Sequence, residues 1–66
     1  MKRFEVAFHF KGIGWDTYTV NAQGIGGARF AAVRRVVNEC GHDTADRIDK
    51  IEVYDEHYNK VFETEW

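Results

Sequence analysis

The chain contains no proline, a single cysteine and no long run of apolar residues. One cysteine excludes an internal disulfide, whereas a secreted domain of this size usually needs several. A membrane-spanning helix needs about 20 apolar residues, and the charged start of the chain interrupts any signal-peptide stretch. We therefore expect a protein of the reducing cytoplasm that stays where it is made.

The 66 residues suffice for one hydrophobic core. A chain near this length buries only about 60% of its unfolded surface, so a second core has no room. Apolar residues make up 44% of the chain, which is typical of a folded globule rather than of a disordered tail. The prediction is a single domain over residues 1–66.

The net charge of −2 is unevenly distributed along the chain. Residues 1–35 contain six basic and two acidic residues, whereas residues 36–66 contain three basic and nine acidic ones. Such an asymmetry can steer the protein toward a charged partner, unless folding interleaves the charges into an ordinary solvated surface. The acidic second half would repel phosphates, so direct nucleic-acid binding would depend on the first half.

Two segments near the start alternate between apolar and polar residues, which predicts strands with one buried face. Glycines in the segment 11–14 allow the chain to reverse between them, so the first hairpin spans Lys2–Ala22. The expected inward positions are Phe4, Val6, Phe8, Phe10, Tyr18, Val20 and Ala22. Trp15, Thr17, Thr19 and Asn21 should share the opposite face with Glu5, Ala7 and His9.

After a glycine-rich connection at residues 24–27, the segment Ala28–Glu39 has helical periodicity, and Gly41 is the expected terminator. On a helical wheel the apolar side consists of Phe30, Val33, Val36, Val37 and Cys40. Cys40 is then a small buried hydrophobe, while Arg34 and Arg35 face solvent. Arg29 falls within the apolar arc. Either its stem packs on the sheet while its guanidinium reaches solvent or a carboxylate, or it anchors an acidic or phosphate group.

The sequence after Gly41 predicts a polar loop at residues 42–47 and then a second hairpin. Its strands are expected at residues 50–54 and 60–66, on either side of a turn at residues 55–59. In the last strand Val61 favours one face as buried, and Phe62 and Trp66 favour the other; we expect Phe62 and Trp66 to be buried. The order β-β-α-β-β predicts an α+β fold of two antiparallel β-hairpins packed on one helix, with one sheet face left open.

No pattern in the chain predicts catalysis, a cofactor or a metal. The segment 24–29 superficially resembles a dinucleotide-binding loop, but Arg29 occupies the third glycine position and no β-α-β unit surrounds it. His9, His42 and His57 are widely separated and lack the paired spacings of zinc sites. We therefore expect a protein that is not an enzyme.

Aromatic residues exceed what the core needs, which leaves Trp15, Tyr54 and Tyr58 for the open face or the loops. Aromatic residues beside arginines are typical of protein interfaces, although they also stack on unpaired bases. The first interpretation is a protein-binding module that covers a basic surface of a larger protein or ribonucleoprotein. The candidate partner-binding residues are Trp15, Glu52, Tyr54, Glu56, Arg34 and Arg35.

Two alternatives remain open. One is a single-stranded nucleic-acid-binding module that uses Arg3, His9, Trp15, Arg34 and Arg35. The other is a structural homo-oligomer, such as a homodimer, joined through an exposed sheet edge that no proline protects.

In layout the chain resembles some small phage-encoded anti-CRISPR proteins. The resemblance lies in the strand Lys2–Phe10, the segment 18–22 leading into an alanine-bearing helix, and the strand 50–54 before a last hairpin. It implies a non-catalytic inhibitor in the host cytoplasm that docks on an RNA-guided surveillance complex, near the surface that receives target DNA.

Overall fold

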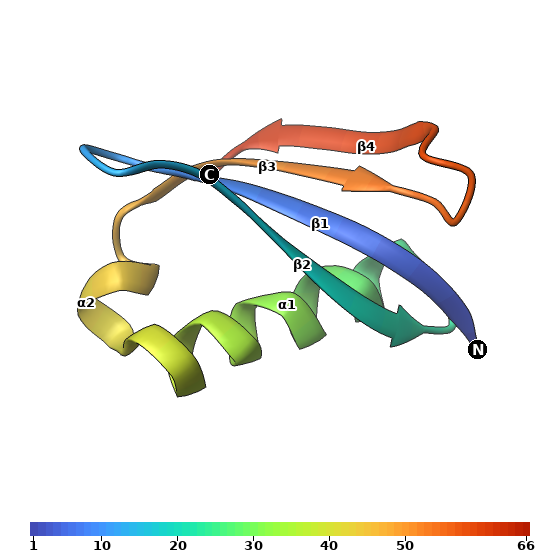
Figure 1. Ribbon diagram of the computed structural model, residues 1–66, viewed down its shortest axis with the longest axis horizontal. Helices are drawn as coiled ribbons and strands as arrows, with labels where there is room; N and C mark the ends of the chain where they lie inside the picture. Colours follow the sequence, from blue (N-terminus) through green and yellow to red (C-terminus); the bar gives the residue numbers. More distant parts are fainter.

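Four antiparallel strands form one sheet, and a helix lies against one of its faces, in a computed structural model that describes residues 1–66 (Figure 1). The elements are β1 (Lys2–Phe10), β2 (Gly14–Ala22), α1 (Ile25–Cys40), α2 (His42–Ala45), β3 (Ile48–Tyr54) and β4 (Lys60–Glu65). The strand order is β2-β1-β3-β4, so the two hairpins lie side by side and are joined by the pairing of β1 with β3. The predicted α+β fold is confirmed.

The core lies on the helix side of the central strands. Val6 pairs with Tyr18 on one side and with Val53 on the other, and Phe8 lies opposite Ile51. Because side chains alternate across a strand, this register gathers the apolar residues of three strands on one face. Every inward position expected for the first hairpin is buried.

α1 packs on the sheet through small residues, namely Ala28, Ala32 and Val36, which are fully buried. The predicted apolar side was therefore wrong in part, since Phe30 is 67% exposed and Cys40 is exposed. The aromatic side chains of the sheet already fill the space between the sheet and the helix. The helix therefore comes closest to the sheet through short side chains, which recur every four residues along one side of it.

The helical segment is longer than predicted. α1 begins at Ile25, three residues before the expected start, because Gly26 and Gly27 belong to its first turn. It ends at Cys40, and Gly41 terminates it as predicted, with the Gly41 N–H donating to the Val37 carbonyl oxygen. The expected loop at residues 42–47 contains the one-turn helix α2.

α1 packs mainly on β2 and β1, and β4 lies at the edge of the sheet away from α1 (Figure 1). Phe62 faces the helix side opposite Val53 and is half-buried against the core, as predicted, while Val61 is exposed. Trp66 follows the strand and is 58% exposed, so its predicted burial was wrong. The helix does not reach far enough over the sheet to cover it.

Candidate functional site

The face of the sheet opposite α1, which we call the outer face, is not covered by any element (Figure 1). Its residues, given by the strand registers, are Arg3, Glu5, Ala7, His9, Trp15, Thr17, Thr19, Asn21, Lys50, Glu52, Tyr54, Lys60, Glu63 and Glu65. Three of the predicted partner-binding residues, Trp15, Glu52 and Tyr54, therefore lie on this one surface.

Glu52 and Tyr54 form a fixed pair near the centre of the outer face. The Tyr54 hydroxyl donates to Glu52 Oε1 at 2.7 Å, and Lys60 Nζ lies 3.4 Å from Glu52 Oε2. The bond from Tyr54, with help from Lys60, lowers the pKa of Glu52 despite partial burial. The same bond raises the pKa of Tyr54. Glu52 is thus held as an oriented carboxylate at neutral pH.

Lysines neutralise two of the six acidic residues of the second hairpin, Glu52 and Glu63. Lys50 Nζ lies 3.7 Å from Glu52 and 3.8 Å from Glu63, and Lys60 Nζ lies 3.3 Å from Glu63. Two lysines and two glutamates therefore form one network with no net charge. The hairpin presents less free negative charge than its sequence suggests, and its side chains are held in place by one another.

Trp15 stands at another part of the outer face and is 52% exposed. Its ring meets the His9 ring edge-on, with 5.2 Å between centroids, and Lys50 Nζ lies 6.0 Å from the Trp15 ring centroid. His9 Nδ1 is in turn 2.7 Å from Asp49 Oδ1. These neighbours orient the indole while leaving half of its surface free.

A depression of about 400 Å³ lies on the outer face, lined by Glu5, Thr17, Tyr54 and Tyr58. Tyr58 comes from the β3–β4 turn, where it has a positive φ of 62° and is exposed. The Asp55 carboxylate accepts backbone N–H groups of Asn59 and His57, which lowers its pKa and fixes the turn. The depression is large enough to receive a side chain of a partner.

The remaining predicted residues lie elsewhere. Glu56 is exposed in the β3–β4 turn, near Arg3 at the start of β1. Arg34 and Arg35 lie on α1, on the other layer of the molecule. The structure therefore does not gather the six predicted residues into one site, and it also separates Arg3, His9 and Trp15 from the arginine pair.

The two helical arginines differ in their contacts. Arg35 donates to the Thr19 carbonyl oxygen at 2.7 Å and to the Glu39 carboxylate at 3.1 Å, and its guanidinium lies 5.2 Å from the centroid of the Tyr18 ring. Arg35 therefore fastens the helix to β2. Arg34 is exposed, and its only aromatic neighbour is Phe30, with the guanidinium 6.0 Å from the ring centroid.

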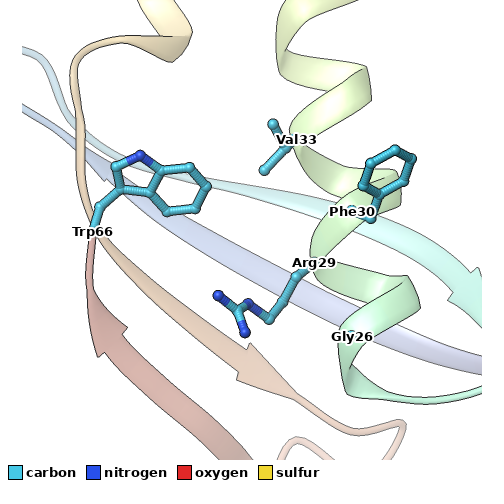
Figure 2. Close-up of a pocket in the computed structure, with 5 residues that line it drawn as sticks. All are labelled: Gly26, Arg29, Phe30, Val33 and Trp66. Carbon is cyan, nitrogen blue, oxygen red and sulfur yellow. The ribbon is translucent and has the colours of Figure 1, made fainter.

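Arg29, which the sequence offered as a possible anchor for an acidic or phosphate group, belongs to a second surface whose other residues were not anticipated. Gly26, Arg29, Phe30 and Val33 of α1 and Trp66 after β4 line a groove of about 280 Å³, which we call the α1–β4 groove. Figure 2 shows Trp66 and the helical residues on opposite sides of the opening, with the Arg29 side chain extended from the helix between them.

Arg29 is held in this groove without an anionic partner. Its guanidinium lies 4.5 Å from the centroid of the Phe62 ring, while its buried Nε has no hydrogen-bond acceptor. None of the ion pairs in the structure involves Arg29. A buried donor without an acceptor costs about 1–3 kcal/mol, and a cation–π contact returns about 0.5–2 kcal/mol of it. The terminal guanidinium nitrogens of Arg29 also make no hydrogen bond or ion pair within the chain, so an anion brought by a ligand could pair with them.

Other reactive groups are not assembled into a site. No three side chains among the histidines, cysteine and acidic residues are grouped to hold a metal ion. Cys40 Sγ lies 3.7 Å from the Tyr18 hydroxyl; burial, followed by this contact, raises the pKa of Tyr18 to about 12. Neither helix has the length and apolar sequence needed to cross a membrane.

No family model, curated protein or solved structure matches this chain. Its function is therefore inferred from its own residues and their geometry.

Acid should weaken the β3–β4 hairpin. The pKa values of Glu52 and Asp55 lie below their ordinary values of 4.5 and 3.8 in the folded protein, because the carboxylates accept hydrogen bonds. Their stabilisation is complete above the ordinary values and is lost as pH falls through the lowered ones. We expect Glu52→Gln to cost roughly 1 kcal/mol at neutral pH, and this cost should shrink as pH falls below 4.5, as measured by urea denaturation across the acid range.

Glu65→Gln is the matched control, because Glu65 lies on the same face but forms no ion pair. It should leave the pH dependence of stability unchanged. Equal effects of the two substitutions at every pH would contradict the assigned role of Glu52.

Proposed function

We propose that this protein is a non-enzymatic protein-binding module that docks through its outer face on a larger protein or ribonucleoprotein. The observation that carries the proposal is the oriented Glu52–Tyr54 pair beside an open depression on an uncovered sheet face. One face of the sheet is packed on α1, which leaves the whole opposite face free for a partner.

The chemistry of this face suits recognition. Trp15, Tyr54 and Tyr58 offer rigid aromatic area, which dominates the affinity of many protein interfaces. The network of Lys50, Lys60 and their glutamates already holds its charges in position. Less side-chain freedom is therefore lost on binding, and this preorganisation favours affinity.

The expected partner presents a basic surface. The chain carries a net charge of −2, and Glu56 and Glu65 remain without a lysine or arginine partner around the neutralised network. A narrower form of the proposal follows the resemblance to anti-CRISPR proteins. In that form the protein is a phage-type inhibitor in the host cytoplasm that covers the DNA-receiving surface of a CRISPR surveillance complex.

The test begins with affinity capture by the tagged chain from lysate, with and without nuclease, followed by affinity measurement for the partner identified. Tyr54→Ala combined with Glu52→Lys should weaken binding by at least 30-fold, because truncation of a central aromatic anchor typically costs about 2 kcal/mol or more. Circular dichroism should show an intact fold.

Arg34→Ala serves as the control, since Arg34 is exposed on the opposite layer. It should change the affinity less than twofold. An unaltered affinity of the Tyr54/Glu52 double variant would refute the proposal. Recovery of nucleic acid alone would favour the nucleic-acid-binding alternative, for which the structure offers no single basic surface built from the predicted residues.

A homo-oligomer is the remaining candidate. It is favoured by one observation, which is that β2 and β4 each pair with a neighbour on one side only. Light scattering across a range of concentrations tests it directly, and a constant monomer mass would exclude it.

A further inference from the structure

The α1–β4 groove lies on the helix side of the sheet, away from the outer face, and is an independent candidate for binding. We propose that it binds an extended segment of another protein that lies along the free edge of β4. This segment places a carboxylate side chain on Arg29 and an apolar side chain against Phe30, Val33 and Trp66.

The first argument is charge complementarity at Arg29. The guanidinium rests on the Phe62 ring, which fixes its position, and its buried Nε has no acceptor within the chain. A carboxylate matches the fork geometry of a guanidinium and can accept two parallel hydrogen bonds. Arg29 is thus held in position to bind an anion, and the chain itself supplies none.

The second argument is the apolar character of the walls around this charge. Phe30 is 67% exposed and Trp66 is 58% exposed, although both line the groove. A free phosphate would leave these surfaces uncovered, and a nucleic acid, whose bases could stack on them, would leave the free edge of β4 unpaired. A peptide covers them, because an acidic side chain and an apolar side chain occur on one chain at short spacing.

The third argument is the unpaired edge of β4. β4 pairs only with β3, so its other edge offers backbone donors and acceptors to an added strand. Side chains of an added strand alternate between the two faces, so its acidic and apolar residues must be two or four positions apart to face the groove. Residues between them would lie beside Glu63 and Glu65, which favours basic side chains there.

A second copy of this chain does not fit the groove. If β4 paired with β4 of another copy, the helix-side residues of the added strand would be Phe62 and Thr64. The acidic residues of that strand, Glu63 and Glu65, would lie on the outer face. This pairing would therefore bring no acidic side chain of β4 to Arg29.

The test uses a phage-displayed library of random twelve-residue peptides, selected on the purified chain and counter-selected on Arg29→Gln. Enriched sequences should contain Asp or Glu with an apolar residue two or four positions away. The strongest binder is then synthesised with a fluorescein label, and its affinity is measured by anisotropy. A hydrogen bond to a charged group implies a loss of tenfold or more in Arg29→Gln.

Arg3→Gln is the matched control, because it removes an exposed arginine at the start of β1, away from the groove, and it should change affinity less than twofold. Trp66→Ala gives a second test should Arg29→Gln fold poorly, since Trp66 lies outside the strands; it should weaken binding at least threefold. Replacing the acidic residue of the peptide by its amide should weaken binding about as much as Arg29→Gln does.

Each of the following results would overturn the proposal. One is the absence of any enriched acidic–apolar sequence, or equal binding to the parent chain, Arg29→Gln and Trp66→Ala. Another is Arg29-dependent binding of a labelled single-stranded oligonucleotide or an Arg29-dependent dimer. The last is loss of peptide binding in Tyr54→Ala, which alters the outer face alone. If no partner binds the outer face, the proposal for the α1–β4 groove still stands, because the two surfaces share no residue.

Discussion

Replacing Phe8 by alanine is expected to unfold most of the protein at room temperature. Phe8 is fully buried in a central strand, with the Phe10 and Tyr18 ring centroids each 6.0 Å away. Truncation of a buried phenylalanine costs about 3–5 kcal/mol, and a domain of this size has a total stability of about 3–5 kcal/mol. Circular dichroism during urea titration should show little or no folded baseline.

Phe30→Ala makes the same chemical change at a position that is 67% exposed. It should cost less than about 1 kcal/mol, because little surface is buried there. A Phe8→Ala variant with the urea midpoint of the parent protein would contradict the packing of the core. Equal losses at the two positions would contradict the orientation of α1.

Gly41→Ala is expected to destabilise the protein by about 1–3 kcal/mol, although the added methyl group would touch nothing. Gly41 joins α1 to α2 with φ 89° and ψ 168°, a backbone conformation that is essentially restricted to glycine. No heavy atom lies within 4 Å of a Cβ built there, so the cost comes from the backbone alone. The thermal midpoint should fall by about 4–8 °C for each kcal/mol lost.

Gly26→Ala is the control of opposite sign. Gly26 lies in the first turns of α1 without a positive φ, and a Cβ there also meets nothing within 4 Å. Alanine should stabilise the helix by about 0.5–1 kcal/mol. Changes of the same sign in the two variants would show that backbone conformation does not decide the outcome at Gly41.

The hairpins were predictable because their signal is local. Strict alternation in β1 and β2 fixes which side chains share a face, and the predicted neighbours His9 and Trp15 are indeed paired. The helix face was harder to predict. A helical wheel predicts burial of Phe30 rather than Ala32, because Phe30 is the more apolar residue. The aromatic side chains of the sheet, however, leave room only for short side chains where the helix contacts the sheet.

The candidate sites were predictable only in their separate parts. Exposure of Trp15 followed from counting the aromatic residues that the core could hold, and Arg29 was conspicuous within the apolar arc. Its neighbours were not predictable, since Trp66 and Arg29 are 37 residues apart in the sequence and line the same groove only because β1 pairs with β3. No local pattern encodes that pairing.

The contact between Arg35 and the Thr19 carbonyl oxygen makes the two edge strands of the sheet, β2 and β4, differ in how freely they can pair with another strand. Stacking of copies into a filament would require β4 of one molecule to join β2 of the next, and the arginine of that next molecule would first have to release the carbonyl oxygen. At the opposite edge, no side chain bonds to a backbone group of β4 from another element. We therefore expect an added strand to join β4 more readily than β2.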